Sequence, residues 1–208
     1  MTTRAIVFDF NGTLSDDEPL LYAVYAELFA EHGRPLTEQE YLDELAGQTE
    51  EEIIRRWLGR VDDDLIRERI DRYVARASDG STIDADARAA LRLAAEHVPV
   101  GVVSAAARRE IEPVLAAAGV VEHVSALVSA DDVTNGKPNP EPYERMASLL
   151  GLDAAEMVAF EDTEAGVASA KAAGAYVVAV TRTLGRERLR AADDFVPRLD
   201  VAVIRTCL

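Results

Sequence analysis

The chain has 208 residues, of which 22 are Lys or Arg and 38 are Asp or Glu, so its formal net charge is −16. An acidic surplus of this size argues against binding to nucleic acid or to an anionic membrane surface, because both need a basic face. Apolar residues make up 49% of the chain, which predicts a packed core and not a disordered segment.

The start of the chain and its cysteine content predict a cytoplasmic protein. The first apolar run, residues 5–8, is too short for the core of a signal peptide. No stretch approaches the roughly 18 apolar residues of a membrane span. The single cysteine, Cys207, has no partner for an internal disulfide or a metal knuckle. We therefore expect a reducing compartment and no membrane partner, while the oligomeric state is not readable.

Short continuous apolar runs recur along the chain, as is typical of strands buried on both faces of a parallel sheet. They cover residues 5–8, 98–103, 124–128, 157–160 and 176–180, with a short sixth candidate at 194–196. Helical patterns follow at 108–118, 140–150 and 164–173, and each ends at a Gly, a common helix stop. Strands alternating with helices predict an α/β fold with a doubly wound, Rossmann-like parallel sheet.

Residues 16–80 interrupt this alternation, because they hold no strand-like run. Their apolar residues recur at helical spacing and predict three or four helices. The stretch contains 18 acids and 8 arginines, so it carries ten of the sixteen surplus negative charges. Turn signals at 15–17 and 79–81 predict two hinges. We expect a helical cap domain at 16–80, inserted into a core domain of residues 1–15 and 81–208.

Polar residues follow four of the predicted strands, and the carboxyl ends of parallel strands line the ligand crevice. Asp9 follows the first strand, Ser104 the second, Lys137 the third after a loop, and Glu161 and Asp162 the fourth. Carboxylates that converge from separate strands repel one another unless a cation neutralises them. An all-oxygen set without His or a second Cys favours Mg²⁺ over Zn²⁺.

Each of these residues also has a purely structural interpretation. Asp9 belongs to an Asn-Gly turn, and Asp162 and Ser104 are also suited to capping helices. The structural interpretation of Lys137 is a solvated loop residue, although it is one of only two lysines in the chain. In the functional interpretation its ammonium bridges a carboxylate and a phosphate oxygen, and Ser104 with the N–H groups at the following helix start forms an anion site.

Four ordered motifs make the chain resemble the haloacid dehalogenase superfamily, in its phosphatase and β-phosphoglucomutase-like branch with a small helical cap. They are VFDFNGTLSD at 7–16, VVS at 102–104, GKPNP at 136–140 and FEDTEAG at 160–166. The loop of Gly47, Gln48 and Thr49 is similar to the substrate-recognition loop of that cap. Metal-free dehalogenases lack the pair Glu161-Asp162, so carbon–halogen hydrolysis is not expected. The order of the motifs along the chain also excludes a response-regulator receiver.

The resemblance implies a magnesium-dependent hydrolase acting on a small phosphorylated metabolite. It implies that Asp9 attacks phosphorus to form an aspartyl-phosphate. It implies that Mg²⁺ is held by the carboxylates of Asp9 and Asp162 and by the backbone carbonyl of Asn11. Glu161 would be a further ligand or would contact the ligands without touching the ion.

The same resemblance assigns the phosphate contacts. Ser104 and Lys137 would hold the transferring phosphoryl group. Backbone N–H groups after Asp9 and after Ser104 would add hydrogen bonds, which places Gly12, Thr13 and Ala105 at the phosphate.

Position 11 departs from the family, whose phosphatases usually carry there an Asp that acts as general acid and base. An amide neither donates nor accepts a proton near neutral pH, and general acid–base catalysis raises the rate roughly 10²–10⁴-fold. One hypothesis is slow hydrolysis, or hydrolysis aided by another acid such as Asp16, Asp17 or Glu18. The alternative is a catalytically impaired protein that binds phosphate or a phosphometabolite.

Three smaller expectations accompany these. A mutase, which moves protons both ways, is disfavoured by Asn11. The pair Asn11-Gly12 is prone to deamidation, which would create an acid at that position. The acidity of the chain favours singly phosphorylated substrates over polyphosphates.

Overall fold

The structure is a computed structural model and describes residues 3–208. Its centre is a six-stranded sheet of order β3-β2-β1-β4-β5-β6 in which every neighbouring pair is parallel. The α/β prediction is therefore confirmed. The strands are β1 (Ala5–Asp9), β2 (Val100–Val103), β3 (Ala126–Val128), β4 (Met157–Glu161), β5 (Tyr176–Val180) and β6 (Asp194–Val196).

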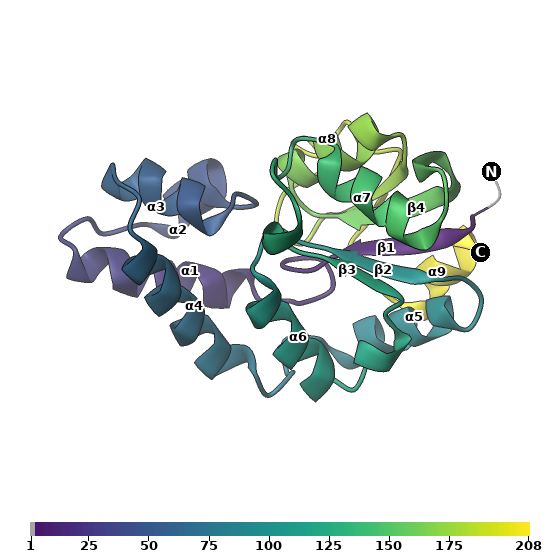
Figure 1. Ribbon diagram of the computed structural model, residues 1–208, viewed down its shortest axis with the longest axis horizontal. Helices are drawn as coiled ribbons and strands as arrows, with labels where there is room; N and C mark the ends of the chain where they lie inside the picture. Colours follow the sequence, from purple (N-terminus) through teal and green to yellow (C-terminus); the bar gives the residue numbers. More distant parts are fainter. Residues whose placement is uncertain (1–2) are drawn as a thin grey trace.

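Helices cover both faces of this sheet (Figure 1). The helices that follow the first hinge are α1 (Glu18–Glu31), α2 (Glu38–Glu40), α3 (Glu50–Leu58) and α4 (Asp63–Ala77), with a π-helical turn at Tyr41–Leu45. The remaining helices are α5 (Ala85–Ala95), α6 (Arg108–Ala117), α7 (Glu141–Leu150), α8 (Glu164–Ala173) and α9 (Val201–Cys207), with 3-10 turns at Val121–His123, Ala130–Asp132 and Ala154–Glu156. Within residues 3–208, no helix has the length and apolar character needed to cross a bilayer.

The alternation along β1 divides the core into two layers. Ala5 and Val7 belong to the apolar cluster that includes the inner faces of α7 and α8. Ile6 and Phe8 belong to the opposite cluster, with residues of α5, α6 and α9. The Phe8 ring stacks on Phe160 of β4 at a centroid distance of 5.3 Å. Continuous apolar runs were the right signal for the central strands, because β1, β2 and β4 are buried along their whole length.

Two predicted strands start later than expected, and two helices were not predicted. β2 starts at Val100 and β3 at Ala126, because a turn after α5 and the turn at Val121–His123 occupy the preceding residues. The Ala-rich helix α5 and the short helix α9 pack together on one face of the sheet. Alanine adds little to a hydrophobic period, so the pattern in α5 is weak.

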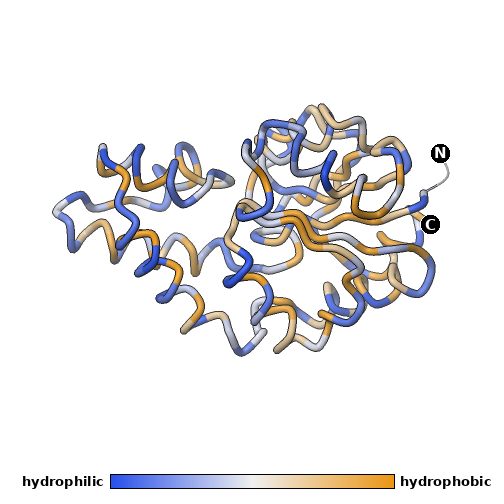
Figure 2. The backbone as a smooth tube through the Cα atoms, viewed as in Figure 1, coloured by the Kyte–Doolittle hydropathy of each residue, from blue (hydrophilic) through white to orange (hydrophobic). Residues whose placement is uncertain are grey.

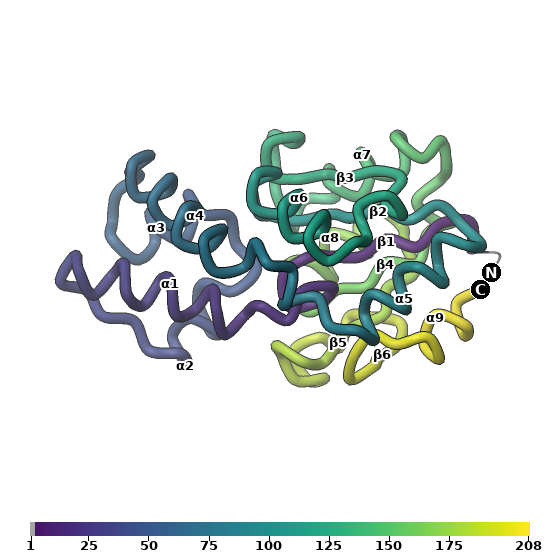
Figure 3. The backbone as a smooth tube through the Cα atoms, turned by 90° about the horizontal axis from the view of Figure 1, so that it is seen from below, coloured from purple at the N-terminus to yellow at the C-terminus, as the bar shows by residue number. Residues whose placement is uncertain are grey.

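Helices α1 to α4 lie together beyond the end of the sheet where β1 stops (Figures 1 and 3). We call residues 16–80 the helical insert. The buried apolar residues of the insert belong to the same hydrophobic cluster as Ile6 and Phe8, and hydrophobic and hydrophilic stretches alternate along its helices (Figure 2). Phe29 of α1 stacks on Trp57 of α3, and the Trp57 indole N–H donates to the Arg34 carbonyl at 3.0 Å. Trp57 is therefore a packing residue of the insert.

A buried ion pair joins the insert to the core. Arg69 of α4 is 3% exposed, and it donates a hydrogen bond to Glu110 of α6, which is fully buried. The same guanidinium lies 3.4 Å from Glu50 of α3 and over the rings of Tyr25 and Tyr73. Removing one partner of such a pair leaves an uncompensated charge in a low-dielectric environment.

We expect Arg69→Met to lower the free energy of unfolding by about 3–5 kcal/mol, because Glu110 is then buried without its counter-charge. Urea denaturation followed by circular dichroism measures the change. The double variant Arg69→Met/Glu110→Leu should recover most of the loss. Arg109→Ala removes an exposed pair with Asp71 and should cost less than about 1 kcal/mol. Equal losses in the two single variants would contradict the buried-pair argument.

Candidate active site

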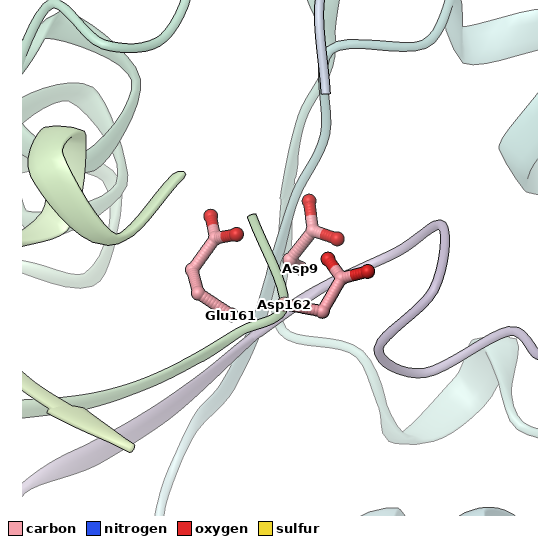
Figure 4. Close-up of side chains that lie close together, drawn as sticks. All are labelled: Asp9, Glu161 and Asp162. Atoms are coloured by element: carbon pink, nitrogen blue, oxygen red, sulfur yellow. The ribbon is translucent and has the colours of Figure 1, made fainter. Parts of the chain in front are cut away.

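The register of the parallel strands brings the polar residues to one edge of the sheet. Asp9 is the last residue of β1 and pairs with Val103 of β2, so Ser104 lies one residue beyond it. Phe8 pairs with Phe160 of β4, which puts Glu161 level with Asp9. The side chains of Asp9, Glu161 and Asp162 lie close together at this edge (Figure 4).

The three acids form a compact, buried cluster. One carboxylate oxygen of each lies within 4.8 Å of the others. Burial raises the pKa of all three, and that of Glu161 to about 7. Within the described part of the chain, Glu161 Oε2 and Asp162 Oδ2 are buried without a hydrogen-bond partner. Hard oxygen donors that are close, buried and unpartnered fit a divalent cation such as Mg²⁺.

Two glycines make room for the acids. A Cβ atom on Gly12 would lie 1.9 Å from Asp162 Oδ2, and Gly12 also has φ = +72°, which disfavours other residues. A Cβ atom on Gly166, in the first turn of α8, would lie 1.8 Å from Glu161 Oε2. The glycines of the first and fourth motifs therefore permit close backbone approach to the carboxylates.

Lys137 lies inside the acidic cluster. Its ammonium is 2.5 Å from Asp9 Oδ1 and 2.5 Å from Glu161 Oε1, and it donates to the Val103 carbonyl at 3.3 Å. Burial lowers the pKa of Lys137, but the two carboxylates outweigh it and hold the pKa above its usual value. The Tyr143 hydroxyl donates to the same Glu161 oxygen at 2.5 Å. Lys137 is thus a buried cation beside Asp9 and not a solvated loop residue.

The surroundings of Ser104 only partly match expectation. Its hydroxyl donates to Asn11 Oδ1 at 3.3 Å and accepts from the Ala106 N–H at 3.0 Å. The next two N–H groups, at the start of α6, donate to Glu110 and Asp131. The expectation that the helix start offers free N–H groups to an anion is therefore wrong for residues 106–108. Ala105 N–H has no hydrogen-bond partner among residues 3–208.

Both ends of the Asn11 amide are held in place. Its Nδ2 donates to Asp17 Oδ2 at 2.9 Å, while Oδ1 accepts from Ser104. Asp17 is fully buried and also accepts from the Gly12 N–H at 3.2 Å and from the Tyr73 hydroxyl. Burial raises the pKa of Asp17 to about 6. The Gly12 N–H is therefore bound to a side chain, not free for a phosphate.

The three acids of the first hinge have different surroundings. Asp16 is exposed and lies 3.3 Å from Arg182. Asp17 lies behind Asn11. Glu18, at the start of α1, lines the cavity that also contains Asp9 and Asn11. Of these three acids, only Glu18 lines the cavity that contains Asp9 and Asp162.

The loop of the insert reaches the same edge of the sheet. Gly47 lies against Thr163, where a Cβ atom would be 2.9 Å from the Thr163 side chain, and it has φ = +80°. Gln48 donates to the Glu44 carbonyl, and Thr49 caps the N-terminus of α3. Thr13, the remaining predicted phosphate residue, donates to Asp162 Oδ1 at 3.3 Å. The loop is next to the cluster, and Thr13 positions an acid.

Two hollows meet at Lys137. The inner cavity, of about 40 Å³, is lined from the core by Asp9, Asn11, Ala105, Lys137 and Asp162 and from the insert by Glu18, Tyr25, Tyr41, Gly47, Gln48, Glu50 and Arg69, among others. The outer cleft, of about 700 Å³, is bordered by α3, α4, the start of α6 and the loop around Gly136. Glu50, Ala105 and Lys137 line both. A ligand bound at Asp9 can therefore extend toward solvent along the cleft.

Several residues that shape the site were not predicted from the sequence. Tyr143, Asp17 as the partner of Asn11, and the pair Arg69–Glu110 were not assigned roles. Arg69 carried a readable signal, because it interrupts the apolar face of α4 between Leu65 and Tyr73. Tyr143 carried none, since a tyrosine in an amphipathic helix is usually a packing residue.

Comparison with known proteins agrees with this geometry. Residues 6–180 match the family described as Haloacid dehalogenase-like hydrolase. The chain is 32% identical over 195 residues to the validoxylamine A 7'-phosphate phosphatase of Streptomyces hygroscopicus subsp. limoneus, with 91% of each chain covered. It is 29% identical over 187 residues to the phosphoglycolate phosphatase of Yersinia pseudotuberculosis, with 86% of this chain and 81% of that one covered.

Among solved structures, the fold is similar to that of β-phosphoglucomutase from Clostridium difficile. The TM-score is 0.86 at 20% sequence identity, and 99% of this chain and 97% of that chain are covered. At this identity the likeness concerns the fold alone.

Proposed function

The chain belongs to the haloacid dehalogenase-like hydrolases, and from that membership we propose that it is a magnesium-dependent phosphatase acting on a small phosphorylated metabolite. The observation that carries the proposal is the contact of Asp9 with Lys137 inside a buried cluster of three carboxylates. The two phosphatases to which the chain was compared above support the same reaction class.

In the proposed reaction Asp9 attacks the phosphorus of a phosphomonoester. A bond forms between its carboxylate oxygen and phosphorus, and the ester oxygen leaves with the bonding electrons. Water then attacks the same phosphorus, and the bond between phosphorus and the Asp9 oxygen breaks, which releases inorganic phosphate and regenerates the Asp9 carboxylate. The proton lost by water balances the proton taken up by the leaving alcohol. Lys137 and the Ser104 hydroxyl hold the phosphoryl oxygens, and the Ala105 N–H is available for a further hydrogen bond. Phosphoryl transfer depends mainly on such positioning and charge neutralisation.

We assign the cation to Asp9, Asp162 and the carbonyl of Asn11. Glu161 is not a direct ligand in this assignment, since its Oε1 already contacts Lys137 and Tyr143. When bound, Mg²⁺ supplies positive charge that offsets the repulsion between the carboxylates and the phosphate. The all-oxygen donor set and the unpartnered Asp162 Oδ2 support this assignment.

We expect millimolar Mg²⁺ to raise the melting temperature by roughly 5–10 °C, because a ligand at about 100 times its Kd adds about 2.7 kcal/mol. Differential scanning fluorimetry with and without EDTA measures the shift. Asp162→Asn should abolish it, and Asp71→Asn, an exposed substitution on α4, should leave it intact. A full shift in Asp162→Asn would rule out the assigned metal site.

We further propose that residues 16–80 act as a cap over a core made of residues 1–15 and 81–208. The contact of Gly47 with Thr163 and the inner cavity between the two parts support this division. A cap that closes over the site excludes water from the phosphoryl group.

A second candidate function is binding of phosphate or a phosphometabolite without efficient turnover. Its specific support is the Asn11 amide, which cannot transfer a proton and is held between Ser104 and Asp17. In that case the phosphate site is used for recognition alone.

Phosphate release from p-nitrophenyl phosphate and a panel of phosphomonoesters, with Mg²⁺ or with EDTA, separates the two. We expect release above background that requires Mg²⁺. The phenolate leaving group needs no protonation, so p-nitrophenyl phosphate should be hydrolysed even without an acid at position 11. If no ester in the panel is hydrolysed while inorganic phosphate binds, the phosphatase proposal fails and the binding function stands.

A further inference from the structure

The insert side of the inner cavity is acidic. Glu18 and Glu50 line it, with a single cation, Arg69, beside them. The Arg69 guanidinium is already engaged by the buried Glu110 and by Glu50. Two buried carboxylates therefore balance its charge, while its Nε–H is buried without a hydrogen-bond partner among residues 3–208. Glu18 feels this charge but forms no ion pair with Arg69.

Two oxygens on this side are buried without a hydrogen-bond partner in the described chain: Glu18 Oε2 and the hydroxyl of Tyr25. Tyr25 is fully buried, and both residues line the inner cavity. Buried polar atoms normally have partners. Unlike the free oxygens of Asp162 and Glu161, these two belong to the insert and not to the acidic cluster of the core.

From these residues we infer that the inner cavity selects phosphomonoesters that carry a cationic amino group near the phosphate, such as amino-alcohol or amino-sugar phosphates, and rejects those with a second anion. This inference rests on the proposed function of the site. The phosphoryl group lies at Asp9 and Lys137. The ammonium donates to Glu18 Oε2 and the Tyr25 hydroxyl, and larger substituents extend into the outer cleft.

The electrostatics of Glu18 support this choice. Burial, together with the neighbouring Asp17 and Asp9, raises the pKa of Glu18 to about 8. An ammonium beside it would stabilise the ionised form, because an opposite charge favours ionisation. A carboxylate or second phosphate there would instead face Glu18 and Glu50, and the charge of the nearby Arg69 is already paired with Glu50 and Glu110.

Three probes of similar size test the inference: phosphoethanolamine, 2-hydroxyethyl phosphate and 2-phosphoglycolate. They carry an ammonium, a hydroxyl and a carboxylate at the same place relative to the phosphate. Isothermal titration calorimetry with Mg²⁺ and the Asp9→Asn variant measures their dissociation constants without turnover. We expect phosphoethanolamine to bind at least about 10-fold more tightly than 2-hydroxyethyl phosphate, as for a charge-assisted buried hydrogen bond. 2-Phosphoglycolate should bind most weakly.

In the same background, Glu18→Gln should bring the first two dissociation constants to within about 3-fold of each other. Glu122→Gln, an exposed substitution outside both hollows, should preserve their ratio. Equal binding of all three probes, tightest binding of 2-phosphoglycolate, no binding of any probe, or an unchanged ratio in Glu18→Gln would each overturn the inference. Wild-type turnover of p-nitrophenyl phosphate tests the proposed function separately, so either idea can fail alone.

Discussion

Replacing Asp9 by asparagine is expected to lower magnesium-dependent phosphate release by at least about 10⁴-fold, since loss of the nucleophile removes the covalent pathway. The amide keeps the size of the carboxylate and part of its hydrogen bonding, so the effect is on chemistry and not on packing. Steady-state release of p-nitrophenol from p-nitrophenyl phosphate measures it.

The fold should survive this substitution. Lys137 keeps a buried counter-charge, because its ammonium also lies 2.5 Å from Glu161. Burial raises the pKa of Asp9, which means that burial destabilises its ionised carboxylate. The neutral amide also removes one of three acids that repel one another. The melting temperature without Mg²⁺ should therefore be unchanged or higher. Asp63→Asn, exposed on α4, should keep wild-type turnover, and an active Asp9→Asn variant would remove Asp9 from the mechanism.

The second large effect concerns position 11. Exchanging the amide and the carboxyl, in the double variant Asn11→Asp/Asp17→Asn, should raise turnover of alkyl phosphates by about 10²–10⁴-fold, the worth of general acid–base help. The exchange preserves the hydrogen bond that joins the two side chains at 2.9 Å. The single variant Asn11→Asp would instead put two carboxyls in contact, so one would take up a proton and its pKa would rise.

The leaving group separates this explanation from others. The gain should be large with 2-hydroxyethyl phosphate, whose alkoxide needs a proton, and small with p-nitrophenyl phosphate. Asp17→Asn alone leaves the amide at position 11 and should not raise turnover of either ester. If the double variant gains nothing on alkyl phosphates, proton transfer at position 11 does not limit the reaction, and another group such as Glu18 supplies the proton.

Much of the fold was predictable from local pattern. Strands buried on both faces need continuous apolar runs, and helices that end in the left-handed conformation favour glycine, as at Gly151 and Gly174. The candidate residues Asp9, Ser104, Lys137 and the acidic pair were also readable, because the carboxyl ends of parallel strands and the loops that follow them lie at one edge of the sheet. Strand starts were less accurate, since turns before β2 and β3 use residues that are equally apolar.

By itself, the sequence determined the α/β class and the family, because these depend on local periodicity and on motifs of adjacent residues. Only the tertiary structure decided which partners the polar residues have. It joined Asn11 to Asp17, Lys137 to two carboxylates, and Arg69 to Glu110 across 41 positions. The same holds for the sixteen surplus negative charges. Composition gives their number, but the position of Glu18 and Glu50 at the cavity depends on how the insert packs against the sheet.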